Sequence, residues 1–376
     1  MNIAPFATEQ YFSLYEFNTP HLLSSSDCET MSISALLDLA GLGMNGLGGL
    51  RLGYTEANGN PDLRVAIAAG YDHILPEQVV VLTSPVEGIY LVMRALLDPG
   101  DEVVVLTPAY DALTNMAEHV AGRIQTWQLA PAADGWQLDF AALERMVSDQ
   151  TKLIVVNFPH NPTGYLPTLD QFQALLDLCA RHGIWLFCDE MYRGLEFGAT
   201  GTLPSAADLY DRAIVLSGLS KTHGLPGLRA GWLLIRDEPT RQALINWKYY
   251  TTICPAGPTE FLALAALTAG ETIVARNRAL IGDNIALAEP FFQRWSDLFT
   301  WRRPRAGSVA FVGLNRPSAT DYCHDLAQEA GVLLLPGACM GYEDRYVRFG
   351  FGRQSFATAL MHYETYLQGE QQAAKR

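Results

Sequence analysis

Short apolar runs separated by longer helical stretches recur along the middle of the chain and constrain the fold more than any other feature. The runs are rich in β-branched residues and apolar on both faces, which is typical of strands buried on both sides of a sheet. They lie at residues 79–82, 102–106, 152–156, 184–188, 213–216 and 230–235. Helical patterns at 87–97, 139–148 and 168–182 separate them. This alternation predicts an α/β fold with a mainly parallel central sheet covered by helices.

The C-terminal part of the chain has a different pattern. It predicts helices at 272–298, 321–330 and 355–367 and strands at 308–314, 332–335 and 346–351. A length of 376 residues favours two domains. We expect a large domain over residues 42–284 and a smaller α+β domain built from residues 1–41 and 285–376. Residues 371–376 are expected to form a frayed tail.

Composition excludes several classes of function. A net charge of −14 argues against a nucleic-acid-binding surface, which needs a basic face. No apolar run reaches the ~18 residues of a membrane span, and the N-terminus lacks the features of a secretory signal. The six cysteines show no metal-ligand spacing, so no metal site is expected. These observations favour a cytoplasmic enzyme with reduced thiols.

Polar residues follow the predicted strands where a functional site would lie. Asn161, Asp189 and Lys221 each come just after a strand. Ligands of such sheets bind beyond the carboxyl ends of the strands. Lys221 is followed eight residues later by Arg229, a pair suited to one chemistry. The amine can form a Schiff base with an aldehyde cofactor, while the guanidinium holds its phosphate.

Four motifs together identify a family resemblance. They are Asn161-Pro162-Thr163-Gly164, Asp189 with Tyr192 three residues on, Ser220-Lys221 and Arg229. The set resembles the class I/II aminotransferases of fold-type I, which use pyridoxal 5′-phosphate (PLP), over about residues 52–352. The resemblance implies a fold-type I PLP transferase that works as a homodimer.

The resemblance implies catalytic roles for Lys221, Asp189 and Tyr192 and a binding role for Asn161. Lys221 would hold PLP as a Schiff base and then shuttle a proton between the substrate Cα and the cofactor. Asp189 would pair with the pyridine nitrogen and keep it protonated. Tyr192 and Asn161 would donate hydrogen bonds to the phenolic oxygen of the cofactor, and Asn161 would also contact the substrate.

Five further residues match the family's binding positions. Arg229 would clamp the phosphate, and Ser220 would add a hydroxyl to it. Tyr110 would stack on the cofactor ring. Arg348 would bind the substrate α-carboxylate. Tyr54 would reach the phosphate bound in the partner subunit, which places the sites at a homodimer interface.

The turn at residues 83–88, which would bind the cofactor phosphate and is called the phosphate cup below, departs from the family pattern. A Gly-Ala-Ser-like triplet normally offers backbone N–H groups to the phosphate at a helix N-terminus. Here Ser84, Pro85 and Val86 take that place, and Pro85 has no N–H. Gly218 stands where serine is usual. A hydroxyl from Ser84 or Thr83 is the expected compensation.

The function predicted from these residues is transamination between an L-amino acid and a 2-oxo acid. An acidic substrate side chain is not expected, since residues 252–257 lack the arginine that dicarboxylate transaminases carry there. β/γ-Elimination and amino-acid cyclisation would use the same residues and stay open. A PLP-sensing regulator would carry a basic winged-helix domain ahead of the PLP domain. The ~50 residues before Tyr54 are not basic, so this class of protein is disfavoured. Partners are therefore small molecules, with no nucleic acid or membrane.

Overall fold

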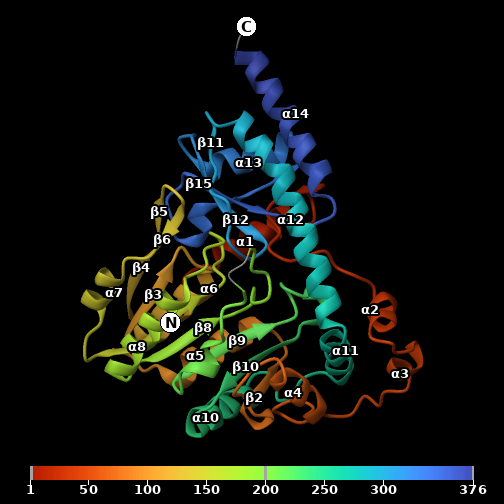
Figure 1. The fold of residues 1–376 in the computed structure, drawn as a ribbon, viewed down its shortest axis with the longest axis vertical. Coiled ribbons are helices and arrows are strands. Elements are labelled where there is room, and N and C mark those ends of the chain that lie inside the picture. The colour runs from red at the N-terminus through yellow and green to blue at the C-terminus, as the bar shows by residue number, and fades with distance from the viewer. Residues whose placement is uncertain (1–2, 199–200, 375–376) are drawn as a thin grey trace.

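The computed structural model describes residues 3–198 and 201–374 of the chain (Figure 1). It contains a seven-stranded sheet and a separate four-stranded sheet. In Figure 1 the larger sheet lies in the lower half and the smaller one in the upper half, and the long helix α12 (Gly270–Arg294) runs along the right-hand side from the lower half to the upper half.

The seven-stranded sheet is mainly parallel. Its order is β2 (Val79–Leu82), β10 (Gly231–Ile235), β9 (Ala213–Gly218), β8 (Trp185–Asp189), β7 (Thr151–Asn157), β3 (Glu102–Thr107) and β4 (Arg123–Gln128). The pairs from β9 to β4 are parallel, whereas β10 is antiparallel to both of its neighbours. The inner strands are buried along almost their whole length, as their apolar sequence requires.

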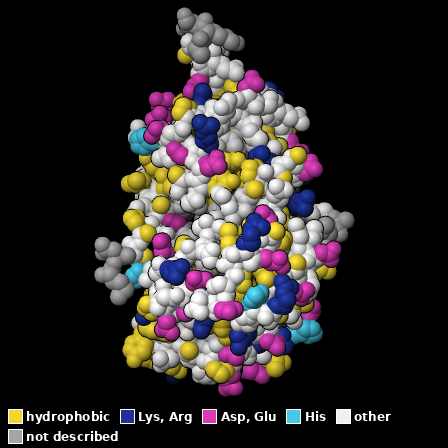
Figure 2. Space-filling view, turned by 90° about the vertical axis from the view of Figure 1, so that its left-hand side faces the viewer, with side chains coloured by type: hydrophobic (Ala, Val, Ile, Leu, Met, Phe, Trp, Pro, Cys, Tyr) yellow, Lys and Arg dark blue, Asp and Glu magenta, His cyan; other side chains and the backbone are white. Residues whose placement is uncertain are grey.

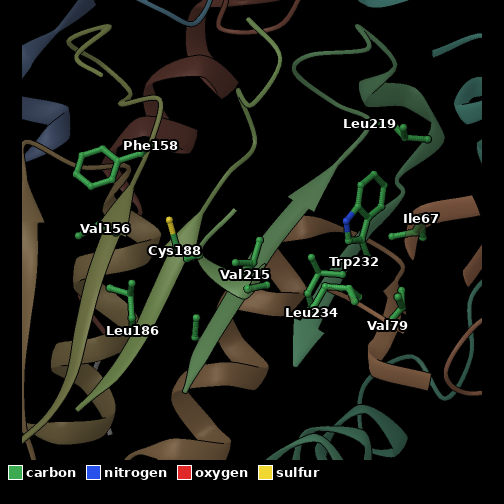
Figure 3. Packing of buried hydrophobic residues seen from close by; sticks show 14 of the residues in the cluster. Ile67, Val79, Val156, Phe158, Leu186, Cys188, Val215, Leu219, Trp232 and Leu234 are labelled. Carbon is green, nitrogen blue, oxygen red and sulfur yellow. The ribbon is translucent and has the colours of Figure 1, made fainter. Parts of the chain in front are cut away.

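Helices cover both faces of this sheet. The helices α5 (Pro85–Leu96), α6 (Asp111–Ala121) and α10 (Glu238–Tyr249) pack on one face. The helices α4 (Pro61–Ala68), α8 (Leu169–His182) and α11 (Gly257–Thr268) pack on the other. Figure 3 shows the core of this second face, where Val156, Cys188 and Val215 lie side by side on adjacent strands.

The four-stranded sheet is antiparallel and has the order β11 (Phe299–Thr300), β12 (Val309–Leu314), β15 (Tyr346–Gly350) and β14 (Leu335–Pro336). The helices α12 and α14 (Phe356–Ala374) contribute to its core, together with α13 (Ala319–Glu329). The N-terminal segment joins this half through β1 (His21–Leu22), which pairs in parallel with β13 (Val332–Leu333). The remaining elements are α1 (Ala7–Tyr15), α2 (Ile33–Leu39), α3 (Met44–Gly48), β5 (Ala130–Ala132), β6 (Gly135–Gln137), α7 (Phe140–Met146) and α9 (Ala206–Leu209), with single turns of 3₁₀ helix at Pro76–Gln78, Pro226–Leu228 and Gly337–Met340.

The predicted fold class is confirmed, with corrections at its C-terminal end. The apolar run predicted as one strand at 332–335 divides into β13 and β14, which pair in different sheets. The helix α14 continues through residue 374, so residues 371–374 are not a frayed tail, while 375 and 376 lie outside the described residues. The glutamines and alanines of residues 371–374 are good helix formers, and Glu370 just before them pairs with Arg316 at 3.2 Å. The division at residues 41/42 and 284/285 stays a prediction, and its second boundary falls within α12.

Charged side chains are mixed on the surface. On the face shown in Figure 2, Lys and Arg side chains lie among Asp and Glu side chains, without a continuous basic patch. Of the helices in residues 3–198 and 201–374, none is both long and apolar enough to cross a membrane.

Candidate active site

The carboxyl ends of β7, β8 and β9 bring the predicted polar residues to one edge of the large sheet. Asn157, the last residue of β7, is in register with Asp189, the last residue of β8. Asp189 is in turn in register with Leu216 of β9, five residues before Lys221. Because the strands are parallel, the loops that follow them start at the same edge.

Asp189 is held rigidly at this edge. Asn157 Nδ2 donates a hydrogen bond of 2.8 Å to the backbone carbonyl of Asp189, and the Met191 N–H donates one of 3.0 Å to its carboxylate Oδ1. Burial raises the pKa of Asp189 to about 6, although the Met191 N–H and the charge on Lys221 act to lower it. A protonated pyridine nitrogen would give this buried carboxylate a cationic partner.

Asn161 connects the Asp189 region to Arg348. Its backbone N–H donates to Asn157 Oδ1 at 2.7 Å, and its side-chain Oδ1 accepts from Arg348 Nη1 at 3.2 Å. Arg348 is 1% exposed, and two more of its nitrogens donate to the carbonyl of Ser24. Burial lowers the pKa of Arg348. A substrate carboxylate would provide the anionic partner that this buried guanidinium lacks among its hydrogen bonds.

Lys221 meets the N-terminal segment at Ser26. Its Nζ donates a hydrogen bond of 2.8 Å to Ser26 Oγ. The segment can approach this closely because Gly350 and Gly352 lack side chains. A Cβ at Gly350 would lie 1.9 Å from the Ser25 carbonyl oxygen, and one at Gly352 would lie 2.3 Å from the Asp27 carbonyl oxygen. Burial lowers the pKa of Lys221, which favours the neutral amine needed for Schiff-base chemistry.

Tyr110 lies at the N-terminus of α6, and the helix α1 contacts it. Its hydroxyl donates a hydrogen bond of 2.7 Å to Glu9 Oε1, and its ring lies 5.1 Å from the Phe6 ring, centroid to centroid. Burial raises the pKa of Tyr110, and the charge on Glu9 raises it further. The predicted stacking of Tyr110 on the cofactor ring stays a prediction.

The unusual phosphate cup has a packing explanation. Pro85 begins α5, and its ring lies where side chains at two neighbouring glycines would go. A Cβ added to Gly218 would lie 3.0 Å from Pro85 Cγ and 2.8 Å from the Ala230 carbonyl oxygen, and one added to Gly231 would lie 2.8 Å from Pro85 Cγ. A side chain at position 218 would therefore crowd both the Ala230 carbonyl and the Pro85 ring. Glycine at position 218 and proline at position 85, the two departures from the family pattern, are in this way linked by packing.

Gly218→Ser is expected to lower the free energy of unfolding by about 1–3 kcal/mol, because it overpacks a closed space. Adding Pro85→Ala should recover part of this loss, since it removes one of the close contacts. Urea denaturation of the single and double variants measures the coupling. Strictly additive losses would contradict the packing explanation.

Other cup residues are suitably placed for an anion. Ser84 is the N-cap residue of α5, and its Oγ, which makes no capping hydrogen bond, accepts a hydrogen bond of 2.6 Å from Arg229 Nη2. Arg229 is exposed and has a φ of 51°, a left-handed conformation that is uncommon for arginine. Val86, which is 39% exposed, lies in the first turn of the same helix, where free N–H groups point outward.

Buried polar atoms without partners provide a test of whether PLP fits this site. Within the described residues, the hydroxyl oxygens of Thr83, Ser220 and Tyr192 are buried and have no hydrogen-bond partner. Unpaired buried polar groups are costly and rare. Thr83 and Ser220 adjoin the cup, where a phosphate would accept their hydrogen bonds, and Tyr192 follows the loop of Asp189, where the phenolic oxygen would lie. The residues present fit PLP.

Within a single chain, Tyr54 does not lie with the other predicted site residues. Its side chain is 91% exposed, and the neighbouring Leu52 is 85% exposed. A tyrosine that acts in the partner's site would have this exposure within one chain.

Sequence reasoning missed several residues that contact the predicted ones. Ser26 pairs with Lys221, Ser24 supports Arg348, and Asn157 positions both Asp189 and Asn161. Glu9 binds Tyr110 from α1. Asn157 could have been found, since it ends a predicted strand just before the Asn161 motif. The other three come from the N-terminal segment, and no local pattern connects them to a site more than 100 residues away.

Comparison with known proteins defines the class. Residues 21–360 match the family model described as aminotransferase class I and II. The chain belongs to this family and is a PLP-dependent enzyme of the aminotransferase type with the fold-type I architecture.

Three known proteins show how this chain relates to particular members. It is 32% identical to capreomycidine synthase of Streptomyces vinaceus over 336 residues, which cover 88% of this chain and 84% of that protein. A PLP-dependent aminotransferase from Streptococcus suis superposes with a TM-score of 0.91 at 27% identity, covering 98% of each chain. The PLP-dependent cyclase OrfR superposes with the same TM-score at 25% identity, again covering 98% of each chain.

Proposed function

We propose that this enzyme transfers the amino group of an L-amino acid to a 2-oxo acid, with PLP bound as a Schiff base to Lys221. The observation that carries the proposal is the grouping of Asp189, Asn161, Lys221 and Arg348 at one sheet edge, with buried hydroxyls left unpaired around it. PLP, when bound, supplies an aldehyde for the amino group and a ring that accepts electrons.

The protein's own residues would orient the substrate and move its proton. Arg348, fixed by Asn161 and Ser24, binds the α-carboxylate and so positions the Cα hydrogen. Lys221 Nζ takes that proton as the neutral amine, which burial favours by lowering its pKa. Asp189 holds a proton on the pyridine nitrogen. The helix α1 contacts this side of the site through Glu9, which accepts from Tyr110, and through the Thr8 N–H, which donates to Asp111.

Arg348→Gln is expected to raise the half-saturating amino-acid concentration about 100-fold, because it removes a charge-assisted contact to the α-carboxylate. Steady-state kinetics measure this change, with Arg348→Lys as the variant that keeps the charge. Arg345→Gln, which alters an exposed arginine close by, is the matched control and should leave the kinetics unchanged. An unchanged constant in a folded Arg348→Gln protein would contradict the assignment of Arg348.

Ring formation or elimination on the same residues is the second candidate. It is favoured by the similarity to a protein named capreomycidine synthase and to a PLP-dependent cyclase. The two candidates differ in their need for an acceptor. A transaminase turns over repeatedly only when a 2-oxo acid is present, whereas a lyase or cyclase needs none. Product formation with and without 2-oxo acid therefore decides between them.

We infer that the active form is a homodimer. Support comes from the exposed apolar side chains of Leu52, Tyr54 and Tyr250, which are 82–91% exposed in one chain. Light scattering should give about twice the chain mass of 41.3 kDa. A monomer with full activity would contradict the role of Tyr54 in the partner's site.

A further inference from the structure

The phosphate cup contains a carboxylate. Glu87 is the third residue of α5, and its Oε2 accepts a hydrogen bond of 3.0 Å from the Thr83 N–H. Its Oε1 accepts from the hydroxyls of Thr251 and Thr252 at 2.6 and 2.7 Å, so its hydrogen-bond donors among the described residues are all neutral. A carboxylate and a phosphate have the same sign of charge. They repel each other in this turn unless a cation compensates one of them.

A fully buried lysine is connected to this carboxylate. Lys248, in the last turn of α10, is 0% exposed, and its Nζ donates a hydrogen bond of 3.0 Å to Thr252 Oγ1. The same hydroxyl donates to Glu87, so a single threonine joins the ammonium group to the carboxylate. Lysine is almost never fully buried unless it is paired. Burial lowers the pKa of Lys248, whereas the charge on Glu87 acts to raise it.

The segment that carries the bridging threonine is held in one conformation. The N–H groups of Thr251, Thr252 and Ile253 all donate to the carbonyl of Lys248, at 3.0–3.2 Å. Ile253 has a φ of 64°, a left-handed conformation that is rare for a β-branched residue. Such a conformation persists only where its surroundings fix it, and it is most frequent at functional sites. Here it accompanies the two hydroxyls that bind Glu87.

The cup also has few backbone donors for an anion. Pro85 has no N–H, and the Thr83 N–H is already bonded to Glu87. A phosphate at this helix N-terminus would therefore depend more on the balance of charge than a phosphate in a cup that offers all of its N–H groups. Arg229 would bind the phosphate directly, which leaves the charge of Glu87 to be compensated by another cation.

We propose that Lys248 is a positioning residue for the cofactor phosphate, which compensates the charge of Glu87 through Thr252 and so allows the cup to hold a dianion. The inference rests on the part of the proposed function that places the PLP phosphate at the cup. It is independent of whether the bound cofactor serves transamination, elimination or cyclisation.

PLP and pyridoxal, which differ only in the phosphate, test this inference without turnover. The probe experiment is an absorbance titration of the PLP-free full-length protein with each aldehyde. Lys248→Met removes the charge and keeps an unbranched side chain. It should raise the dissociation constant of PLP about ten-fold and that of pyridoxal by less than about two-fold. Lys152→Met, which alters an exposed lysine on β7, is the matched control and should change neither constant.

A second substitution should restore the binding of PLP. Adding Glu87→Gln to Lys248→Met removes the charge that the lysine compensates, so most of the lost affinity should return. Adding Glu260→Gln instead, which alters another carboxylate whose charge acts on Lys248, should restore little. Thr252→Val removes only the bridging hydroxyl and should cause a smaller loss that is again selective for PLP. It provides the test if Lys248→Met does not fold.

Equal losses of affinity for PLP and pyridoxal in Lys248→Met, no loss for either, or no recovery with Glu87→Gln would overturn the inference. Arg229→Gln separates this failure from failure of the phosphate assignment, because Arg229 would bind the phosphate directly. A PLP-selective loss in Arg229→Gln but not in Lys248→Met would refute the role of Lys248 alone. Absence of a selective loss in both variants would place the phosphate elsewhere and contradict both.

Discussion

Lys221→Ala is expected to reduce turnover about 10⁴-fold, because the variant loses both the covalent anchor for PLP and the base that moves the Cα proton. The amine lies after β9 and is held by Ser26 in a buried environment that lowers its pKa. The other lysines in the described parts of the chain are Lys152, at the start of β7, and Lys248, on α10. The measurement is the rate of 2-oxo acid formation by the purified variant at saturating PLP.

The fold should survive this substitution. Lys221 makes a single side-chain hydrogen bond, to Ser26, so the thermal unfolding transition should stay close to that of the wild type. Lys152→Ala, which changes an exposed lysine on β7, serves as the matched control and should keep full activity. A folded Lys221→Ala protein that still turns over would contradict the assignment.

Asp189→Asn is expected to reduce turnover about 10³-fold and, at the same time, to stabilise the PLP-free protein. The activity falls because an amide cannot keep the pyridine nitrogen protonated, so the ring becomes a poorer electron acceptor. Stability rises because the buried carboxylate is costly to ionise. A pKa raised from 3.8 to about 6 corresponds to about 3 kcal/mol above pH 7.

The contribution of Asp189 to the stability of the PLP-free protein should depend on pH. The folded PLP-free protein keeps a proton on Asp189 up to about pH 6, whereas the unfolded chain loses it near pH 3.8. Between these values the folded state binds more protons, so the contribution of Asp189 to stability falls as pH rises. The Asn variant should lack this fall. Urea denaturation of both PLP-free proteins from pH 4 to pH 8 measures the difference, and parallel curves would refute the effect.

Local sequence patterns predicted the elements that are buried on both faces. The runs at 79–82, 152–156, 184–188 and 213–216 became β2, β7, β8 and β9 with ends shifted by no more than two residues. Elements with weaker patterns were missed. The strand β4 is largely exposed or half-buried, and the helices α10 and α11 were not predicted. An exposed edge strand such as β4 and a partly polar helix such as α10 leave a weaker periodic signal, and α11 is apolar on most sides, so it lacks the alternation that marks a helix.

The site was predictable only where a residue belongs to a local motif. Asp189, Asn161 and Lys221 follow strands whose burial can be read from the sequence, and the parallel sheet brings them together. Ser26 and Glu9 reach the site through tertiary packing. Ser26 depends on the close approach that Gly350 allows, and such an approach has no signature in either segment alone.

The most direct test of the central claim is a single-turnover experiment with PLP-loaded protein and an L-amino acid in the absence of any acceptor. Each active site should release one equivalent of 2-oxo acid and no ammonia, because the amino group stays on the cofactor until an acceptor takes it. Continued product formation with release of ammonia, or a cyclic product, would contradict transamination and favour the second candidate.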